Sequence, residues 1–258
     1  MGASVEYRIA EHIAWITLNR PDNHNALSDA LTGELDDAVH QANADDGVRF
    51  IVLGAKGKTF CAGADIKAAG QGSIGGGGLH GPSPYVSILN QLLDGPKPVV
   101  GRIQGGAFGG GLGLVTACDI IVAAESVPFA YSEVRLGVAP WMLSVVLQRK
   151  GVLTASAPLM LTGERFDAHK AQEINLVHKV VPDEALDQAV REEIEKLLAC
   201  GPKALQDVKR IARTIPALSL QEGFAFAERA SAALFGSDEG REGMAAFREK
   251  RKPQWMRE

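Results

Sequence analysis

The 258-residue sequence is poor in cysteine, in aromatic residues and in net positive charge. Its three cysteines, Cys61, Cys118 and Cys200, follow no disulfide or zinc-binding spacing, so we expect neither a disulfide-stapled fold nor a structural zinc site. The net charge of −4 argues against a broad nucleic-acid-binding surface, which needs a basic excess. No run is long and apolar enough to cross a bilayer, and the N-terminal residues do not read as a signal peptide. We therefore expect a globular cytoplasmic protein without a nucleic-acid or membrane partner.

The first half of the chain alternates between two kinds of apolar pattern. Short apolar runs typical of strands alternate with segments whose apolar residues recur every three or four positions, which predicts α/β crossover units. The predicted strands are residues 12–20, 49–55, 98–104 and 119–126. The predicted helices are residues 28–45, with Ser28 as N-cap, then 64–70, 84–94 and 110–117.

After about residue 140 the sequence becomes helical in character. Only residues 176–181 resemble a strand, and every periodic segment beyond Gly201 has helical spacing. We predict an α/β core, residues 1–200, followed by a helical part, residues 201–258. Residues 70–84 are rich in glycine and serine, which indicates a flexible surface loop or, alternatively, a mobile lid over a site.

Two turns in the predicted core have the same kind of sequence, in which small residues precede a predicted helix. In "KTFCAGADIK" a strand-like run ends at Phe60 and small residues lead into a predicted helix near Ala64, and in "GGAFGGGLGLVTACD" small residues lead into a predicted helix near Gly110. The first N–H groups of a helix have no partner inside the helix, and the helix dipole favours negative charge there. Two such groups directed at one oxygen would form an oxyanion hole, although a glycine-rich turn often reflects only tight packing.

These segments, together with "RPDNHNAL" and "FAYSEVRLGVAP", resemble the enoyl-CoA hydratase/isomerase (crotonase) superfamily over nearly the whole chain, and look closest to bacterial methylglutaconyl-CoA-type hydratases. The resemblance implies an α/β spiral of ββα repeats and a helical C-terminal trimerisation part. It also implies trimers that often pair into hexamers, and an acyl-CoA thioester as ligand, with no cofactor besides the coenzyme A of the substrate. Carried over to this sequence, the oxyanion N–H groups are those of Ala64 and Gly110. The residues along the coenzyme A moiety would be Ala26, Ala62, Asp65, Ile66 and Lys67.

One carboxylate that the resemblance implies is missing. Hydratases of this family use two glutamates that hold one water between them as general base and general acid. The second matches Glu133, but the first, three residues after Gly110, is Gly113. We interpret Gly109–Gly111 as letting the thioester oxygen reach the backbone, and Gly113 as removing a carboxylate and leaving room for substrate.

The missing glutamate leaves several functions open. Glu133 alone could hydrate a branched or carboxylated enoyl-CoA of the 3-methylglutaconyl type, where a second buried carboxylate would repel the substrate. It could instead shuttle a proton between C2 and C4 as a 3,2-enoyl isomerase, or serve a glutaconyl-type decarboxylase. A non-catalytic acyl-CoA binder is the alternative class, and an RNA-binding role is disfavoured by the acidic balance.

Three further residues carry two interpretations each. Tyr131 and Trp141 could line the acyl pocket or pack in the core, and Ser144 could bind an acyl carboxylate or lie on a helix surface. Cys61 precedes the first turn and is expected as a small buried hydrophobe. The six histidines have no metal-site spacing, so no metal is expected.

Overall fold

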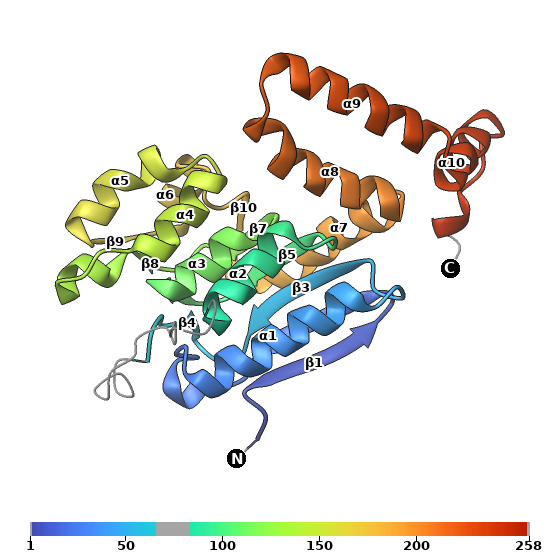
Figure 1. The fold of residues 1–258 in the computed structure, drawn as a ribbon. Helices are drawn as coiled ribbons and strands as arrows, with labels where there is room; N and C mark the ends of the chain where they lie inside the picture. Colours follow the sequence, from blue (N-terminus) through green and yellow to red (C-terminus); the bar gives the residue numbers. More distant parts are fainter. Residues whose placement is uncertain (1, 66–82, 257–258) are drawn as a thin grey trace. The chain divides into compact units, whose positions relative to one another are not determined.

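The computed structural model describes residues 2–65 and 83–256. The chain divides into two compact units, Met1–Val190 and Arg191–Glu258, whose boundary falls within helix α7, Leu186–Leu198. Figure 1 gives the course of the chain within each unit.

A six-stranded sheet carries the core of the first unit. Its strands lie in the order β1 (Val5–Ala10), β2 (Ile13–Leu18), β3 (Phe50–Ala55), β5 (Val99–Ile103), β7 (Ile120–Ala124) and β10 (Lys179–Val181). Only the β1–β2 pair is antiparallel. All six residues of β3 are buried, as expected for a parallel strand covered on both faces.

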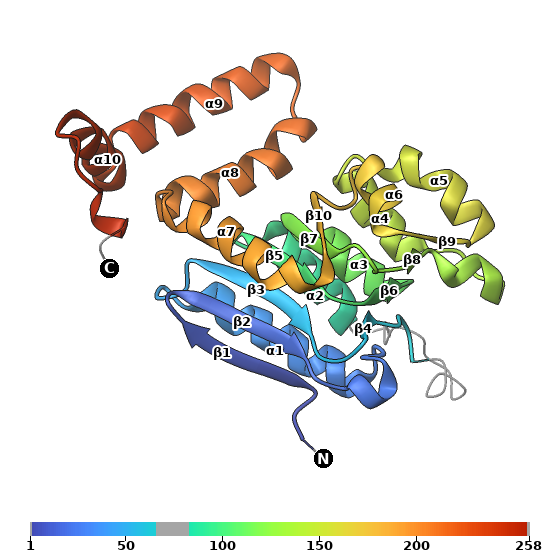
Figure 2. The same cartoon turned by 180° about the vertical axis from the view of Figure 1, so that it is seen from behind.

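A second, smaller sheet contains four very short strands, β4 (Thr59–Cys61), β6 (Gly106–Phe108), β8 (Phe129–Ala130) and β9 (Arg165–Phe166). The β4–β6 and β6–β8 pairs are parallel, and these strands are labelled together in Figure 2. Each of these three strands follows a strand of the large sheet: β3 leads to β4, β5 to β6 and β7 to β8. The chain therefore winds from one sheet to the other and returns through helices, which confirms the predicted α/β spiral of ββα units.

Helices pack in a row beside the sheets. They are α1 (Asp29–Ala44), α2 (Pro84–Asp94), α3 (Gly110–Ala117), α4 (Trp141–Arg149), α5 (Leu153–Thr162) and α6 (Ala168–Glu173), and each of α1 to α4 contacts the next one. Ser28 caps α1 as predicted, since its hydroxyl accepts a hydrogen bond from the Leu31 N–H. Helix α2 begins with Ser83 as N-cap and Pro84 in its first turn, and its buried residues recur at helical spacing.

Most predicted elements are confirmed, and most of the differences fall on the shortest ones. Strands β6, β8 and β9 were not predicted, because two or three residues are too few for a periodic pattern, and the six-residue strand β1 was also not predicted. The predicted helix 64–70 does not begin at Ala64, which forms an isolated bridge with Leu27, and residues 66–70 lie outside the described residues. The glycine-rich loop also lies outside them up to residue 82, and residues 83–84 begin α2.

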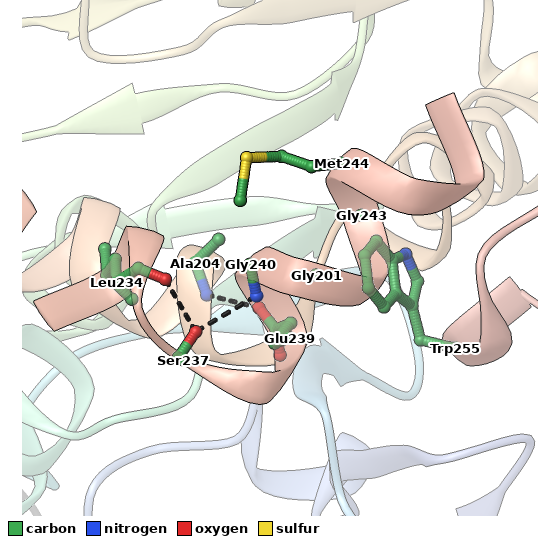
Figure 3. A pocket seen from close by; sticks show the side chains of 9 residues that line it. All are labelled: Gly201, Ala204, Leu234, Ser237, Glu239, Gly240, Gly243, Met244 and Trp255. Carbon is green, nitrogen blue, oxygen red and sulfur yellow. Dashed lines mark hydrogen bonds between the residues drawn. The ribbon is translucent and has the colours of Figure 1, made fainter. Parts of the chain in front are cut away.

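The second unit is helical, as predicted. It contains α8 (Pro202–Thr214), α9 (Leu220–Phe235) and α10 (Asp238–Arg248). A mostly apolar cavity of about 280 Å³ lies in this unit, and Figure 3 shows the side chains that line it. The Glu239 carboxylate accepts hydrogen bonds there from the N–H groups of Lys203 and Ala204 at the start of α8. Glu239 is therefore used to cap a helix. None of the helices in the described residues is both long and apolar enough to span a membrane.

Candidate active site

Three segments of the first unit meet at one edge of the small sheet. They follow β4, β6 and β8, which are parallel neighbours, so their carboxyl ends lie side by side. A Cβ built on Gly63 would lie 2.7 Å from the Phe108 carbonyl oxygen and 3.3 Å from the Gly110 nitrogen. The Gly109 N–H donates to the Ala130 carbonyl at 3.1 Å. The two glycine-bearing turns identified in the sequence therefore touch, backbone against backbone.

The two predicted oxyanion donors belong to these touching turns. Gly110 is the first residue of α3, and its N-cap Gly109 has no side chain to satisfy the first N–H groups. Among the described residues, no hydrogen bond occupies the N–H of either Ala64 or Gly110. The N–H of Ala64 does not stand at a helix start as expected, so of the pair only Gly110 has the helix-dipole contribution. Two unpaired N–H groups on adjacent turns are the arrangement that an oxyanion hole requires.

At each of the glycines 109–111, other atoms of the protein lie where a side chain would begin. A Cβ on Gly111 would lie 2.3 Å from the Cys61 carbonyl oxygen, and one on Gly110 would lie 2.9 Å from Leu27 Cδ1. Gly109 has a φ of 50° and its Cβ would lie 3.1 Å from Glu133 Oε1. Close packing against Glu133, Leu27 and Cys61 therefore also requires small residues at these positions, besides the predicted approach of the thioester oxygen.

Glu133 brings a carboxylate to the same turn. It lies in a 3₁₀ helix, Ser132–Leu136, directly after β8, and its side chain is half-buried. The Oε2 atom is buried and, among the described residues, has no hydrogen-bond partner. Burial raises the pKa of Glu133 above the ordinary glutamate value. A half-buried carboxyl group with a raised pKa beside unpaired N–H groups is suited to general acid and base catalysis.

Gly113 does not open space in this structure, which corrects the expectation that it adds volume. A Cβ on Gly113 would lie 2.2 Å from the hydroxyl oxygen of Tyr85 in α2. Tyr85 is buried and its hydroxyl donates to the Gly110 carbonyl at 2.7 Å. The place of the missing carboxylate is therefore filled by a phenol from another helix.

Comparison with known proteins agrees with this geometry. The family model described as "Enoyl-CoA hydratase/isomerase" matches residues 8–258. The chain belongs to the enoyl-CoA hydratase/isomerase family. It is 35% identical to an enoyl-CoA hydratase of Mycobacterium tuberculosis, covering 95% of this chain and 93% of that protein. It is also 35% identical to a carnitinyl-CoA dehydratase of Salmonella arizonae, covering 93% of each. The crystal structure of an enoyl-CoA hydratase from Shewanella pealeana superposes with a TM-score of 0.89 at 31% identity, over 98% of this chain and 96% of that one. The protein is thus an enzyme of the enoyl-CoA hydratase/isomerase family.

Most of the residues predicted to bind coenzyme A lie next to each other in the structure. The segments 23–27 and 62–65 run side by side, with the Ala62 N–H donating to the His24 carbonyl at 3.0 Å and Asn23 Nδ2 donating to Asp65 Oδ2 at 2.9 Å. Ala26, Ala62 and Asp65 are brought together in this way. Ile66 and Lys67 lie outside the described residues.

Asn25, which the sequence analysis did not single out, holds this loop in position. It is fully buried with a φ of 51°, a conformation that asparagine tolerates better than most residues. Its side chain accepts from the Arg20 N–H and donates to the carbonyls of Lys56 and Thr59. The signal that could have found it is its place inside "RPDNHNAL".

The structure distinguishes between the two interpretations given for Tyr131 and Trp141. Tyr131 is fully buried, stacks on Phe166 and donates its hydroxyl to Ser156, which favours the core-packing interpretation over the acyl-pocket one. Trp141 is 79% exposed in the single chain, so it is not packed in the core. The Ser144 hydroxyl donates to the Trp141 carbonyl of its own helix.

Cys61 is fully buried, and burial raises the pKa of its thiol to about 12. A thiol that stays protonated is a poor nucleophile, so the interpretation of Cys61 as a small core residue is the one that the structure favours.

Proposed function

We propose that the enzyme adds water to, or removes it from, the C2–C3 double bond of an enoyl-CoA whose acyl group is branched or carboxylated, of the 3-methylglutaconyl type. The observation that carries the proposal is the buried, unpaired Oε2 atom of Glu133 beside the first turn of α3, where residue 113 contributes no second carboxylate. The coenzyme A belongs to the substrate, and no further cofactor takes part.

The proposed hydration uses one carboxylate for both proton transfers. The thioester oxygen binds the N–H groups of Ala64 and Gly110, which stabilise the negative charge that develops on it. Glu133 takes a proton from water as the water oxygen bonds to C3, and the π electrons move onto the thioester oxygen to give an enolate. The enolate then collapses and C2 takes the proton from Glu133, so that one water has been added.

The substrate class follows from the charge balance of the site. A second glutamate beside Glu133 would repel an acyl carboxylate in this poorly solvated position. The phenol of Tyr85 is neutral, because burial, with a further contribution from the charge of Glu133, raises its pKa far above the ordinary tyrosine value. An acyl group with its own carboxylate therefore meets one negative charge in place of two. The dehydratase among the relatives supports the lyase chemistry.

A 3,2-enoyl isomerase is the second candidate. Moving a double bond needs a single group that removes a proton at one carbon and returns it at another, and Glu133 is a single carboxylate. The same buried Oε2 atom supports this reaction.

Mass spectrometry of CoA thioesters incubated with the enzyme in D₂O separates these reactions. The panel contains straight 2-enoyl and 3-enoyl chains, 3-methylglutaconyl-CoA and its hydrated counterpart. We expect gain or loss of water, fastest on the carboxylated pair. Deuterium at C2 or C4 without a change in water content would establish the isomerase, and loss of carbon dioxide a decarboxylase. No change on any thioester would leave a non-catalytic acyl-CoA binder.

We also propose that the enzyme assembles as a homotrimer or as a hexamer of two trimers. Large apolar side chains are exposed in both units, which a monomer rarely tolerates. In the first unit they include Leu136, Trp141, Val145 and Leu161, and in the second Leu220, Phe224, Phe235 and Phe247. Size-exclusion chromatography with light scattering should give three or six times the chain mass, and a monomer would contradict the proposal.

A further inference from the structure

A tyrosine hydroxyl lies at the centre of the site, although no motif pointed to it. Tyr85 stands in the first turn of α2, directly after its N-terminal Pro84. Its hydroxyl oxygen would lie 3.5 Å from a Cβ on Gly110 and 2.2 Å from a Cβ on Gly113. The Glu133 carboxylate lies beside Gly109 in the same turn, and its charge acts on Tyr85. The carboxylate and the phenol therefore border the same first turn of α3, around the Gly110 N–H.

We propose that Tyr85 replaces the missing carboxylate as the second group that holds the water, accepting a hydrogen bond from it on the phenol oxygen while Glu133 takes the proton. This inference rests on the hydratase function proposed above. Its geometric basis is that the phenol oxygen occupies the space that a side chain at residue 113 would enter, so the two cannot be present together.

The hydrogen bonding of Tyr85 fits an acceptor. A phenol has one proton, and Tyr85 donates it to the Gly110 carbonyl at 2.7 Å. Within the described residues no protein group donates to the phenol oxygen, so its lone pairs are available to a water. One water hydrogen would bond to Glu133 and be transferred, and the other would bond to Tyr85 and remain on the new hydroxyl group.

Burial keeps the proton on Tyr85, so that it acts as an acceptor and not as a base. Burial is the main cause of its raised pKa, and the negative charge of Glu133 adds to it. The two residues therefore have different roles. Glu133 transfers the proton, and Tyr85 orients the nucleophilic water without adding negative charge.

The variant Tyr85→Phe tests this role, because it removes the oxygen and keeps the ring that packs on α3. We expect kcat for hydration to fall by about tenfold or more, the effect of one lost hydrogen bond in a closed site. KM and the affinity for butyryl-CoA, measured by calorimetry, should change less than about threefold. Exchange of the C2 proton of butyryl-CoA with D₂O needs Glu133 and the oxyanion donors but no bound water nucleophile, so it should continue at the wild-type rate.

The second variant returns an oxygen to the same place. In the Tyr85→Phe background a Cβ at residue 113 would meet the ring carbon Cζ at 3.5 Å, an ordinary contact. Tyr85→Phe/Gly113→Ser should therefore recover part of the lost hydration, whereas Gly113→Ser alone clashes with the phenol and should not exceed the wild type. Gly33→Ser, on the surface of α1, is the matched control and should leave hydration unchanged.

Two results would overturn the inference. Hydration by Tyr85→Phe at the wild-type rate would exclude a role for the oxygen. A parallel loss of hydration and of C2 exchange, with no recovery in the double variant, would mean that Tyr85 only supports the Gly110 turn. A different result would refute the proposed function. If the wild-type enzyme had no hydratase activity, the hydratase function itself would be wrong, whatever the Tyr85 variants do.

Discussion

Glu133→Gln should lower kcat by about 10³-fold, within the range measured for loss of a general acid–base group. The amide keeps the size of the side chain but can neither take the water proton nor return it to C2. Binding of butyryl-CoA should stay near the wild-type value, because the oxyanion donors are backbone groups. The exposed Glu164 provides the control, and Glu164→Gln should leave kcat unchanged. Wild-type turnover by Glu133→Gln would show that another group moves the proton.

The same carboxylate sets the expected pH dependence. Hydration needs ionised Glu133, and burial raises the pKa of Glu133. The acidic limb of the kcat/KM profile should therefore lie above the ordinary glutamate range, with activity lost as the pH falls through the raised pKa. An acidic limb at or below the ordinary glutamate value would contradict this assignment.

Gly111→Ala should be the most destabilising small substitution in the site, by about 3 kcal/mol. The added methyl would lie 2.3 Å from the Cys61 carbonyl oxygen and 2.8 Å from its carbonyl carbon, and neither backbone atom can move without shifting β4. Chemical denaturation would measure the loss of unfolding free energy.

Gly33→Ala is the matched control for that measurement. Nothing lies within 4 Å of a Cβ on Gly33 in helix α1, so the same change there should stabilise the protein by up to about 1 kcal/mol through helix propensity. Equal effects of the two substitutions would mean that the close contact at Gly111 relaxes at no cost.

The sequence predicted the parts of the fold that depend on local chemistry. Helices 84–94 and 110–117 were predicted at the bounds that the structure gives, because Pro84, Ser83 and the spacing of apolar residues mark α2 without reference to the rest of the chain. Glu133 was placed in the site by the family resemblance, and in the structure its carboxylate lies beside Gly109, although its burial and its unpaired Oε2 atom could not be known.

The error at Gly113 has a definite physical cause. An absent side chain in one helix indicates space only if no neighbouring element fills that space, and here α2 fills it with Tyr85. The periodicity of α2 places Tyr85 on the same face as Ile88, Leu89 and Leu92, which predicts that it is buried. Which residue it meets depends on tertiary packing between α2 and α3, and a single sequence does not encode that distance locally.

The distribution of the site over the spiral has a consequence for how activity is acquired during folding. Ala64, Gly110 and Glu133 each follow a strand of a different ββα unit, and these three strands, β4, β6 and β8, are parallel neighbours in the small sheet. No single unit contains a working fragment of the catalytic machinery, so a nascent chain stays inert until its third unit has docked. Catalysis therefore needs all three units in place. During refolding, the recovery of enzyme activity should follow the docking of the last unit, whereas the circular dichroism signal of the helices should appear earlier.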